Sequence, residues 1–209
     1  MRTSAWKLLL ACSGVLCGCA SPRERLYTLS RPEPPAAVTQ PTLHVLVGPV
    51  TIPEAVDRPQ LVVRRNSVQL VALEQERWAE PLREAIPRVL SDAIAGKLPT
   101  VSATSFASTP HTQWDMRVFV DITRFEVIPG EWVIIEAHWW LQLASDDRVP
   151  DGSSVIRMPV RGGPQDCDAI VAAEAAGLDQ VGAVLSQAIA SEAVGLRHSV
   201  RPTRGSPSN

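Results

Sequence analysis

Hydrophobic and polar residues alternate most clearly in the second half of the chain. Two such stretches, 114–128 and 132–143, are separated by the dipeptide Pro129-Gly130. Strict alternation is typical of β-strands with one buried face, and a Pro-Gly pair commonly forms a turn. We therefore predict an antiparallel pair of strands, followed by a polar turn over 146–152 and a further strand over 154–160.

The strand predicted over 132–143 carries apolar residues on both of its faces. Every second residue from Val133 to Leu143 is apolar, as expected for the face that lies on the core. The opposite face includes Trp132, Ile134 and Trp140, and such a face is too apolar to meet only water. Either another part of the domain or a partner covers it, so Trp132 and Trp140 are candidate partner contacts.

Two other segments space their apolar residues as helices do. The first, from about Trp78 to Leu98, places them every three or four positions, at Leu82, Ile86, Leu90 and Ile94. Pro81 suits the first turn of this helix, whereas Pro87 removes a backbone donor and predicts a kink or a later start. The second segment, 167–192, is rich in alanine, which predicts a long and closely packed helix.

Shorter strand-like stretches precede the first helix. Apolar residues alternate over 43–47, a brief strand is expected at 27–29, and 61–65 with 67–73 predict a hairpin around Arg65-Asn66. The order strands, helix, strands, helix predicts an α+β domain over 42–198. In this fold a mainly antiparallel sheet carries two long helices on one face. Residues 199–209 are expected to be a disordered tail.

The N-terminus has the features of a secretory signal. Arg2 and Lys7 precede a short apolar stretch that ends in Leu16-Cys17-Gly18-Cys19, and these four residues resemble a bacterial lipobox. The apolar run is shorter than the ~20 residues that a spanning helix needs. We predict a lipoprotein signal peptide over 1–18 and lipidation of Cys19. A weaker second lipobox candidate ends at Cys12, and an ordinary secretory signal is the other alternative.

Lipidation would decide where the protein resides. Residues 19–41 would then form the lipid anchor, a short tether and a proline-rich connector. Acyl chains such as palmitate on one cysteine hold a protein firmly on a membrane. Because no Asp follows at the second mature position, we expect the outer membrane, with the domain facing the periplasm.

Composition and charge exclude some classes of partner and chemistry. The chain has 20 basic and 22 acidic residues and no basic run, so a nucleic acid is not an expected partner. The sequence contains none of the common hydrolase, metalloprotease or phosphate-loop motifs, and its four histidines are scattered. We therefore predict no enzyme activity, no catalytic residues, no metal site and no cofactor.

Several short motifs along the chain resemble those of one known family. The motifs are Val47-Gly48-Pro49-Val50, Asp57-Arg58-Pro59-Gln60, Arg64 and Arg77-Trp78-Ala79-Glu80-Pro81-Leu82, together with the stretch 118–143. They resemble the PqiC-like lipoproteins, also called ABC-type transport auxiliary lipoproteins. The lipobox and Tyr27-Thr28-Leu29 fit the same family. The resemblance covers nearly the whole mature chain, and Cys17 and Pro87 depart from it.

This resemblance implies a role in transport. Such lipoproteins sit at the outer membrane and work with an inner-membrane protein that carries a mammalian-cell-entry (MCE) domain, and with its ABC transporter or membrane subunits. The chain would be a non-enzymatic docking or adaptor subunit for lipid transport, and it would form a homo-oligomer on the leaflet.

Charged residues beside the predicted strands offer candidate contacts for such a partner. Asp57, Arg58 and Arg64 suit an ion-paired contact, and a local salt bridge that fixes the loop is the equal alternative. Two other functions stay open: a periplasmic lipid-binding carrier and an assembly chaperone for an outer-membrane protein.

Overall fold

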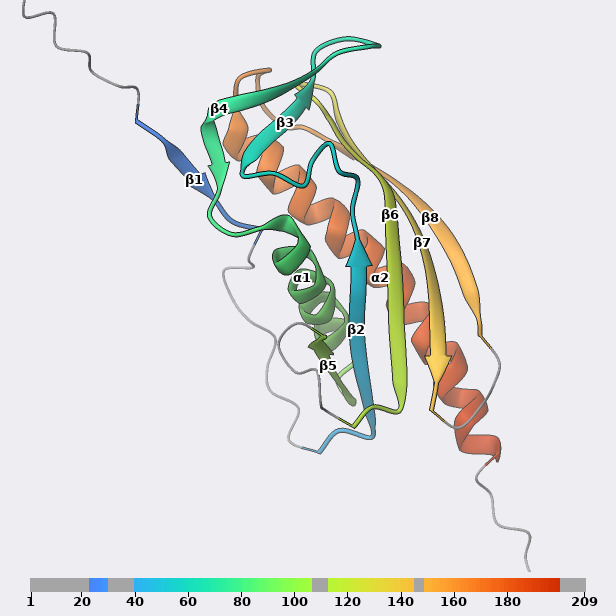
Figure 1. The fold of residues 1–209 in the computed structure, drawn as a ribbon. Helices are drawn as coiled ribbons and strands as arrows, with labels where there is room; N and C mark the ends of the chain where they lie inside the picture. Colours follow the sequence, from blue (N-terminus) through green and yellow to red (C-terminus); the bar gives the residue numbers. More distant parts are fainter. Residues whose placement is uncertain (1–22, 30–39, 107–112, 145–148, 200–209) are drawn as a thin grey trace, which may run out of the picture.

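The computed structural model describes residues 23–29, 40–106, 113–144 and 149–199 (Figure 1). The predicted signal peptide, the lipidation site Cys19, most of the proline-rich connector and nearly all of the predicted tail lie outside the described residues. Ser199, the first residue of that predicted tail, ends the last helix.

The larger sheet has five strands and mixed directions. Its order is β5 (Val101–Ser105), β2 (Leu43–Thr51), β6 (Met116–Ile128), β7 (Trp132–Leu143) and β8 (Asp151–Pro159). β2 pairs in parallel with both β5 and β6, whereas β6, β7 and β8 are antiparallel. The predicted β6–β7 pair and its turn are confirmed, and Gly130 there has a φ of 74°, which favours glycine.

A second sheet of three strands has the order β1 (Arg25–Tyr27), β4 (Leu70–Trp78) and β3 (Gln60–Arg64). β3 and β4 form the predicted hairpin, and β1 pairs with β4 in parallel. The prediction of one mainly antiparallel sheet is therefore wrong. Parallel pairing joins strands that are distant along the chain, and a local alternation of residues carries no information about it.

Two helices cover one face of the five-stranded sheet, as predicted (Figure 1). α1 (Leu82–Lys97) contacts β2 and β5, α2 (Cys167–Ser199) contacts β7 and β8, and the helices pack on each other. A Cβ atom added at Gly182 of α2 would collide with Ala93 of α1, so the two helices approach closely. The segment Cys167–Val194 of α2 is long and apolar enough to span a membrane, but more than half of it is buried against the rest of the fold.

Pro87 lies inside α1 and does not delay its start. The helix begins at Leu82, directly after Pro81, and continues through Pro87. The predicted later start is wrong because Leu82, Ala85 and Ile86, all ahead of the proline, are already packed in the core. That burial offsets the backbone hydrogen bond that proline cannot donate.

The two faces of β7 differ as the alternation predicted. Val133, Ile135 and Leu141 are fully buried on the face beneath the helices. On the opposite face Ile134 is also buried, because β3 packs against β6 beside it. Part of the domain therefore covers this second face. Trp132 and Trp140 remain 38% and 37% exposed.

One carboxyl group is buried in this core with an oxygen atom that has no hydrogen-bond partner among the described residues. Glu174 of α2 is only 3% exposed, and its Oε2 atom accepts no hydrogen bond from the residues that the structure describes. Burial disfavours the charged carboxylate and raises the pKa of Glu174 to about 8. Glu174 is therefore protonated in the folded protein at neutral pH.

The buried carboxyl predicts a stability that falls as the pH rises. Because the pKa of Glu174 is higher in the folded than in the unfolded chain, the folded state is most favoured below the ordinary carboxyl pKa and loses stability as the pH approaches 8. Between pH 5 and pH 7.5 we expect the free energy of unfolding to fall by about 3 kcal/mol more in the wild type than in Glu174→Gln. Urea unfolding at both pH values measures the difference. Glu131→Gln, at an exposed position, is the control, and an equal pH dependence in wild type and Glu174→Gln would contradict the prediction.

Candidate functional site

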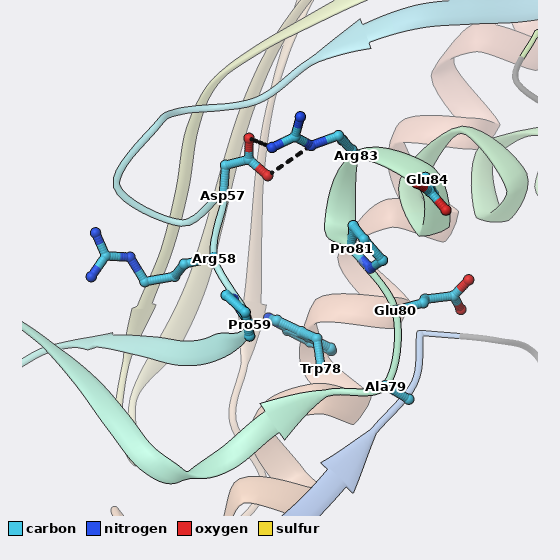
Figure 2. Close-up of a pocket in the computed structure, with 9 residues that line it drawn as sticks. All are labelled: Asp57, Arg58, Pro59, Trp78, Ala79, Glu80, Pro81, Arg83 and Glu84. Atoms are coloured by element: carbon cyan, nitrogen blue, oxygen red, sulfur yellow. Dashed lines mark hydrogen bonds and ion pairs between the residues drawn. The ribbon is translucent and has the colours of Figure 1, made fainter.

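Two loops that are distant in sequence meet at the start of α1. The loop between β2 and β3 contains Asp57, Arg58 and Pro59, and it lies against the junction of β4 and α1. The Trp78 amide donates a hydrogen bond of 2.7 Å to the Pro59 carbonyl. Between the loops is a pocket of about 430 Å³ (Figure 2), lined by Asp57, Arg58, Pro59, Trp78, Ala79, Glu80, Pro81, Arg83 and Glu84.

An ion pair closes one side of this pocket. Arg83, in the first turn of α1, donates to both carboxylate oxygens of Asp57, at 2.6 Å from Nη2 and 3.2 Å from Nε. A two-pronged contact of this kind fixes the loop more firmly than a single hydrogen bond does. Asp57 therefore makes a local salt bridge, one of the two alternatives that the sequence left open.

The remaining walls combine apolar surface with unpaired charge. Trp78 is 8% exposed, and Pro59 and Pro81 stand at the rim on either side of it (Figure 2). Arg58 is exposed and points away from the helix, and no acidic side chain among the described residues pairs with it. Glu80 forms an ion pair with Arg88 of α1. An apolar floor with a charged rim is typical of surfaces that bind polypeptide.

The first described segment of the chain is attached beside this pocket. The Ala79 amide donates to the Tyr27 carbonyl at 2.8 Å, next to the register pair Tyr27–Trp78. The carboxylate of Glu76, which is 8% exposed, accepts hydrogen bonds from Arg25 Nε at 3.0 Å and from the Tyr27 hydroxyl at 2.7 Å. We call Arg25, Tyr27 and Glu76 the Glu76 cluster.

The charges of the Glu76 cluster depend on one another. Burial disfavours the charged form of Glu76, but the hydrogen bonds from Arg25 and Tyr27 outweigh it, so the pKa of Glu76 is lowered. Burial and the bond to Glu76 together raise the pKa of the Tyr27 phenol. Glu76 is thus an ionised acceptor that holds β1 on β4.

Arg64 belongs to a separate network between the two sheets. It forms an ion pair with Glu126 of β6 and donates from Nε to Oε2 at 3.1 Å. Arg124 donates to the same Glu126 at 2.9 Å and to Glu136 of β7 at 3.0 Å. The hydrogen bond from Arg64 is the largest of the effects that lower the pKa of Glu126. Arg64 therefore fixes the hairpin to the larger sheet.

The two candidate tryptophans lie far apart on the outer face of β7. They are eight residue steps apart along one strand, or about 26 Å. The Trp140 ring stacks on Phe119 with centroids 5.2 Å apart, and the guanidinium of Arg117 lies 4.7 Å from the Phe119 centroid. Arg157 lies over the Trp132 ring at 5.6 Å.

The five predicted contact residues thus occupy separate places. Asp57 and Arg58 line the pocket, Arg64 lies between the sheets, and Trp132 and Trp140 stand at distant points of β7. Sequence reasoning missed the other wall of the pocket, including Trp78, Glu80 and Arg83, as a contact site. The motif 77–82 carried that signal, since the family resemblance already rested on it.

The described residues include no group of three metal-binding side chains. The buried thiol of Cys167 has a raised pKa, chiefly because burial disfavours the thiolate. A raised pKa makes this cysteine a poor nucleophile.

Comparisons with known proteins agree with the motifs. A family model described as ABC-type transport auxiliary lipoprotein component matches residues 27–186. A crystal structure of an uncharacterized protein is similar, with a TM-score of 0.67 and 19% identity, over 80% of this chain and 99% of that one. A Xanthomonas campestris protein of the DUF330 family has a TM-score of 0.60 and 20% identity, over 78% and 92% of the two chains. No curated protein matches the sequence.

Removal of the charge from Glu76 should loosen β1. We expect Glu76→Gln to lower the free energy of unfolding by about 1–3 kcal/mol at pH 7, because a buried acceptor of charge-assisted hydrogen bonds is lost. The pKa of Glu76 is lowered in the folded state, so this stability is present above the ordinary carboxyl pKa. The difference from wild type should shrink as the pH falls through the lowered pKa.

Urea unfolding at pH 7 and at pH 3 measures both effects. Glu74→Gln on the same strand is the matched control, because Glu74 is exposed and bonds only to Gln60 in the described structure. Equal losses in the two variants would show that the Glu76 cluster does not fix β1.

Proposed function

Since the chain belongs to the PqiC-like family of ABC-type transport auxiliary lipoproteins, we propose that it is the outer-membrane adaptor of an MCE-type lipid transport system. In this proposal Cys19 carries the acyl chains in the periplasmic leaflet, and the domain binds the MCE-domain protein that reaches it from the inner membrane. The role is docking, without chemistry on a substrate.

The observation that carries this proposal is the meeting of two family motifs in one pocket. Residues 57–59 of one motif and 78–81 of the other line this pocket, and the family match spans both motifs. The apolar floor at Trp78 and the guanidinium of Arg58, which pairs with no acidic side chain in the described part of the chain, suit a polypeptide that carries acidic side chains near apolar ones. We therefore assign the docking of the MCE-domain protein to this pocket.

The length of the tether supports a position close to the leaflet. Four residue steps separate Cys19 from Arg23, the first described residue, so the chain spans at most about 14 Å between them. An acylated Cys19 would therefore hold the body against the membrane, where a homo-oligomer could form a collar around the arriving partner.

The close packing of the helices disfavours a lipid carrier. Such a protein needs an apolar cavity between helices and sheet, whereas Gly177 of α2 lies directly against Ile135 of β7. The pocket at Trp78 is rimmed by charged side chains. An acyl chain would meet Asp57, Arg83 and Glu84 there, and their desolvation would oppose its binding.

Photocrosslinking in the cell envelope tests the proposed partner. A photoreactive amino acid at Arg58 should capture the MCE-domain protein from detergent-solubilised envelopes, as identified by mass spectrometry. The same photoreactive amino acid in place of Gln180, which is exposed on α2, serves as the control. Capture of a β-barrel protein instead would favour the assembly chaperone and contradict the transport adaptor.

Charge reversal at the pocket should weaken docking without unfolding the protein. We expect Arg58→Glu to lower the recovery of the MCE-domain protein several-fold, because a rim charge would then repel its acidic side chains. The free energy of unfolding should stay within about 0.5 kcal/mol of the wild-type value, since Arg58 is exposed. Arg161→Glu, at another exposed position, should recover the partner normally. Equal recovery with both variants would exclude Arg58 from the contact.

A further inference from the structure

We propose that the tip of the β3–β4 hairpin, residues 65–70, inserts its apolar side chains into the leaflet that holds the acyl anchor. This proposal rests on the anchoring at Cys19 proposed above. The occupant of the exposed apolar tip would thus be lipid, with the hairpin as a second point of contact between the domain and the membrane.

The tip exposes apolar side chains from a well-defined turn. Val68 is 91% exposed and Leu70 is 40% exposed. The Arg65 amide donates to the Gln69 carbonyl at 2.9 Å, and the Val68 amide donates to Asn66 Oδ1 at 3.0 Å. These bonds hold Val68 outward, and its exposure is therefore a property of the turn.

An ion pair with the larger sheet supports the hairpin. Arg64 donates from Nη1 to the carbonyls of Asn66 and Ser67, at 3.2 and 3.3 Å, while its guanidinium also pairs with Glu126. The tip is thereby braced against β6. A braced turn can press two apolar side chains into a membrane without losing its shape.

The hairpin tip and the start of the described chain lie at the same end of the domain. β1 and β4 run parallel, with Arg25 opposite Glu76, and Figure 1 shows the start of β1 and the tip of the β3–β4 hairpin at the upper end of the molecule, separated by the length of β4. Six residue steps separate Cys19 from Arg25, so the tether spans at most about 22 Å before β1. A leaflet that holds an acylated Cys19 within this reach of β1 can therefore also meet Val68 at the hairpin tip.

The chemistry of the tip fits a headgroup layer. The segment 65–70 contains Arg65 and no acidic residue, and the exposed Arg23 lies on the tether that leads to the anchor. Cationic side chains beside apolar ones bind leaflets that contain anionic phospholipids.

A fluorescent label at the tip tests this contact in the full-length lipoprotein. The protein with Cys167→Ala and Val68→Cys is labelled with an environment-sensitive dye and reconstituted into phosphatidylethanolamine–phosphatidylglycerol vesicles. Intact mass first verifies the acyl chains on Cys19. The matched control is Val149→Cys, an exposed valine just before β8 at the opposite end of the sheet.

We expect the label at position 68 to shift its emission to the blue, to lose quenching by aqueous iodide and to gain quenching by lipids that carry a nitroxide. The label at position 149 should stay accessible to iodide. Both proteins should keep the circular dichroism of wild type, which verifies that they are folded.

Three results would overturn the proposal in different ways. Equal iodide quenching at positions 68 and 149 in an acylated protein would show that the tip stays in water, and the adaptor function would still stand. Protection from iodide without quenching by lipid nitroxide would show a protein cover, such as a second copy. Absence of acyl chains from the mature protein would overturn the anchored adaptor together with this contact.

Discussion

The ionised carboxylate of Glu76 is the constraint on which the arrangement of this protein depends. It accepts hydrogen bonds from Arg25 and Tyr27 and so joins the chain that follows Cys19 to the middle of the second sheet. A short strand of three residues has little stability of its own. The buried, charge-assisted hydrogen bonds supply the stability that β1 lacks. They give the start of the domain a fixed position beside the hairpin and the pocket.

In the proposed function, that fixed position connects the membrane to the docking pocket. Tyr27 accepts a hydrogen bond from Ala79, and Trp78 and Ala79 form part of the pocket wall. A pull on the tether therefore acts on β4 and on the start of α1, rather than on a loose terminus. An adaptor between two membranes benefits from such a rigid attachment, because the pocket keeps one orientation relative to the leaflet while its partner binds.

The sequence predicted the elements with a strong local pattern and missed those that depend on distant pairing. The alternation around Pro129-Gly130 predicted β6 and β7, and Asn66 marked the β3–β4 turn. β5 escaped prediction because Val101–Ser105 consists mainly of small polar residues. The pocket escaped it for a related reason: its walls, near Arg58 and Trp78, meet only through the register of β3 on β4.

Hydrogen exchange of the full-length lipoprotein in vesicles tests this account most directly. If the Glu76 cluster fixes β1, the backbone amides of Arg25–Tyr27 and of Ala79 should exchange far more slowly than those of an unfolded chain, and Glu76→Gln should speed them without affecting α2. Exchange of these amides at the rate of an unfolded chain in wild type, with α2 still protected, would contradict it. The tether would then be a flexible linker, and neither the pocket nor the hairpin would have a fixed orientation at the membrane.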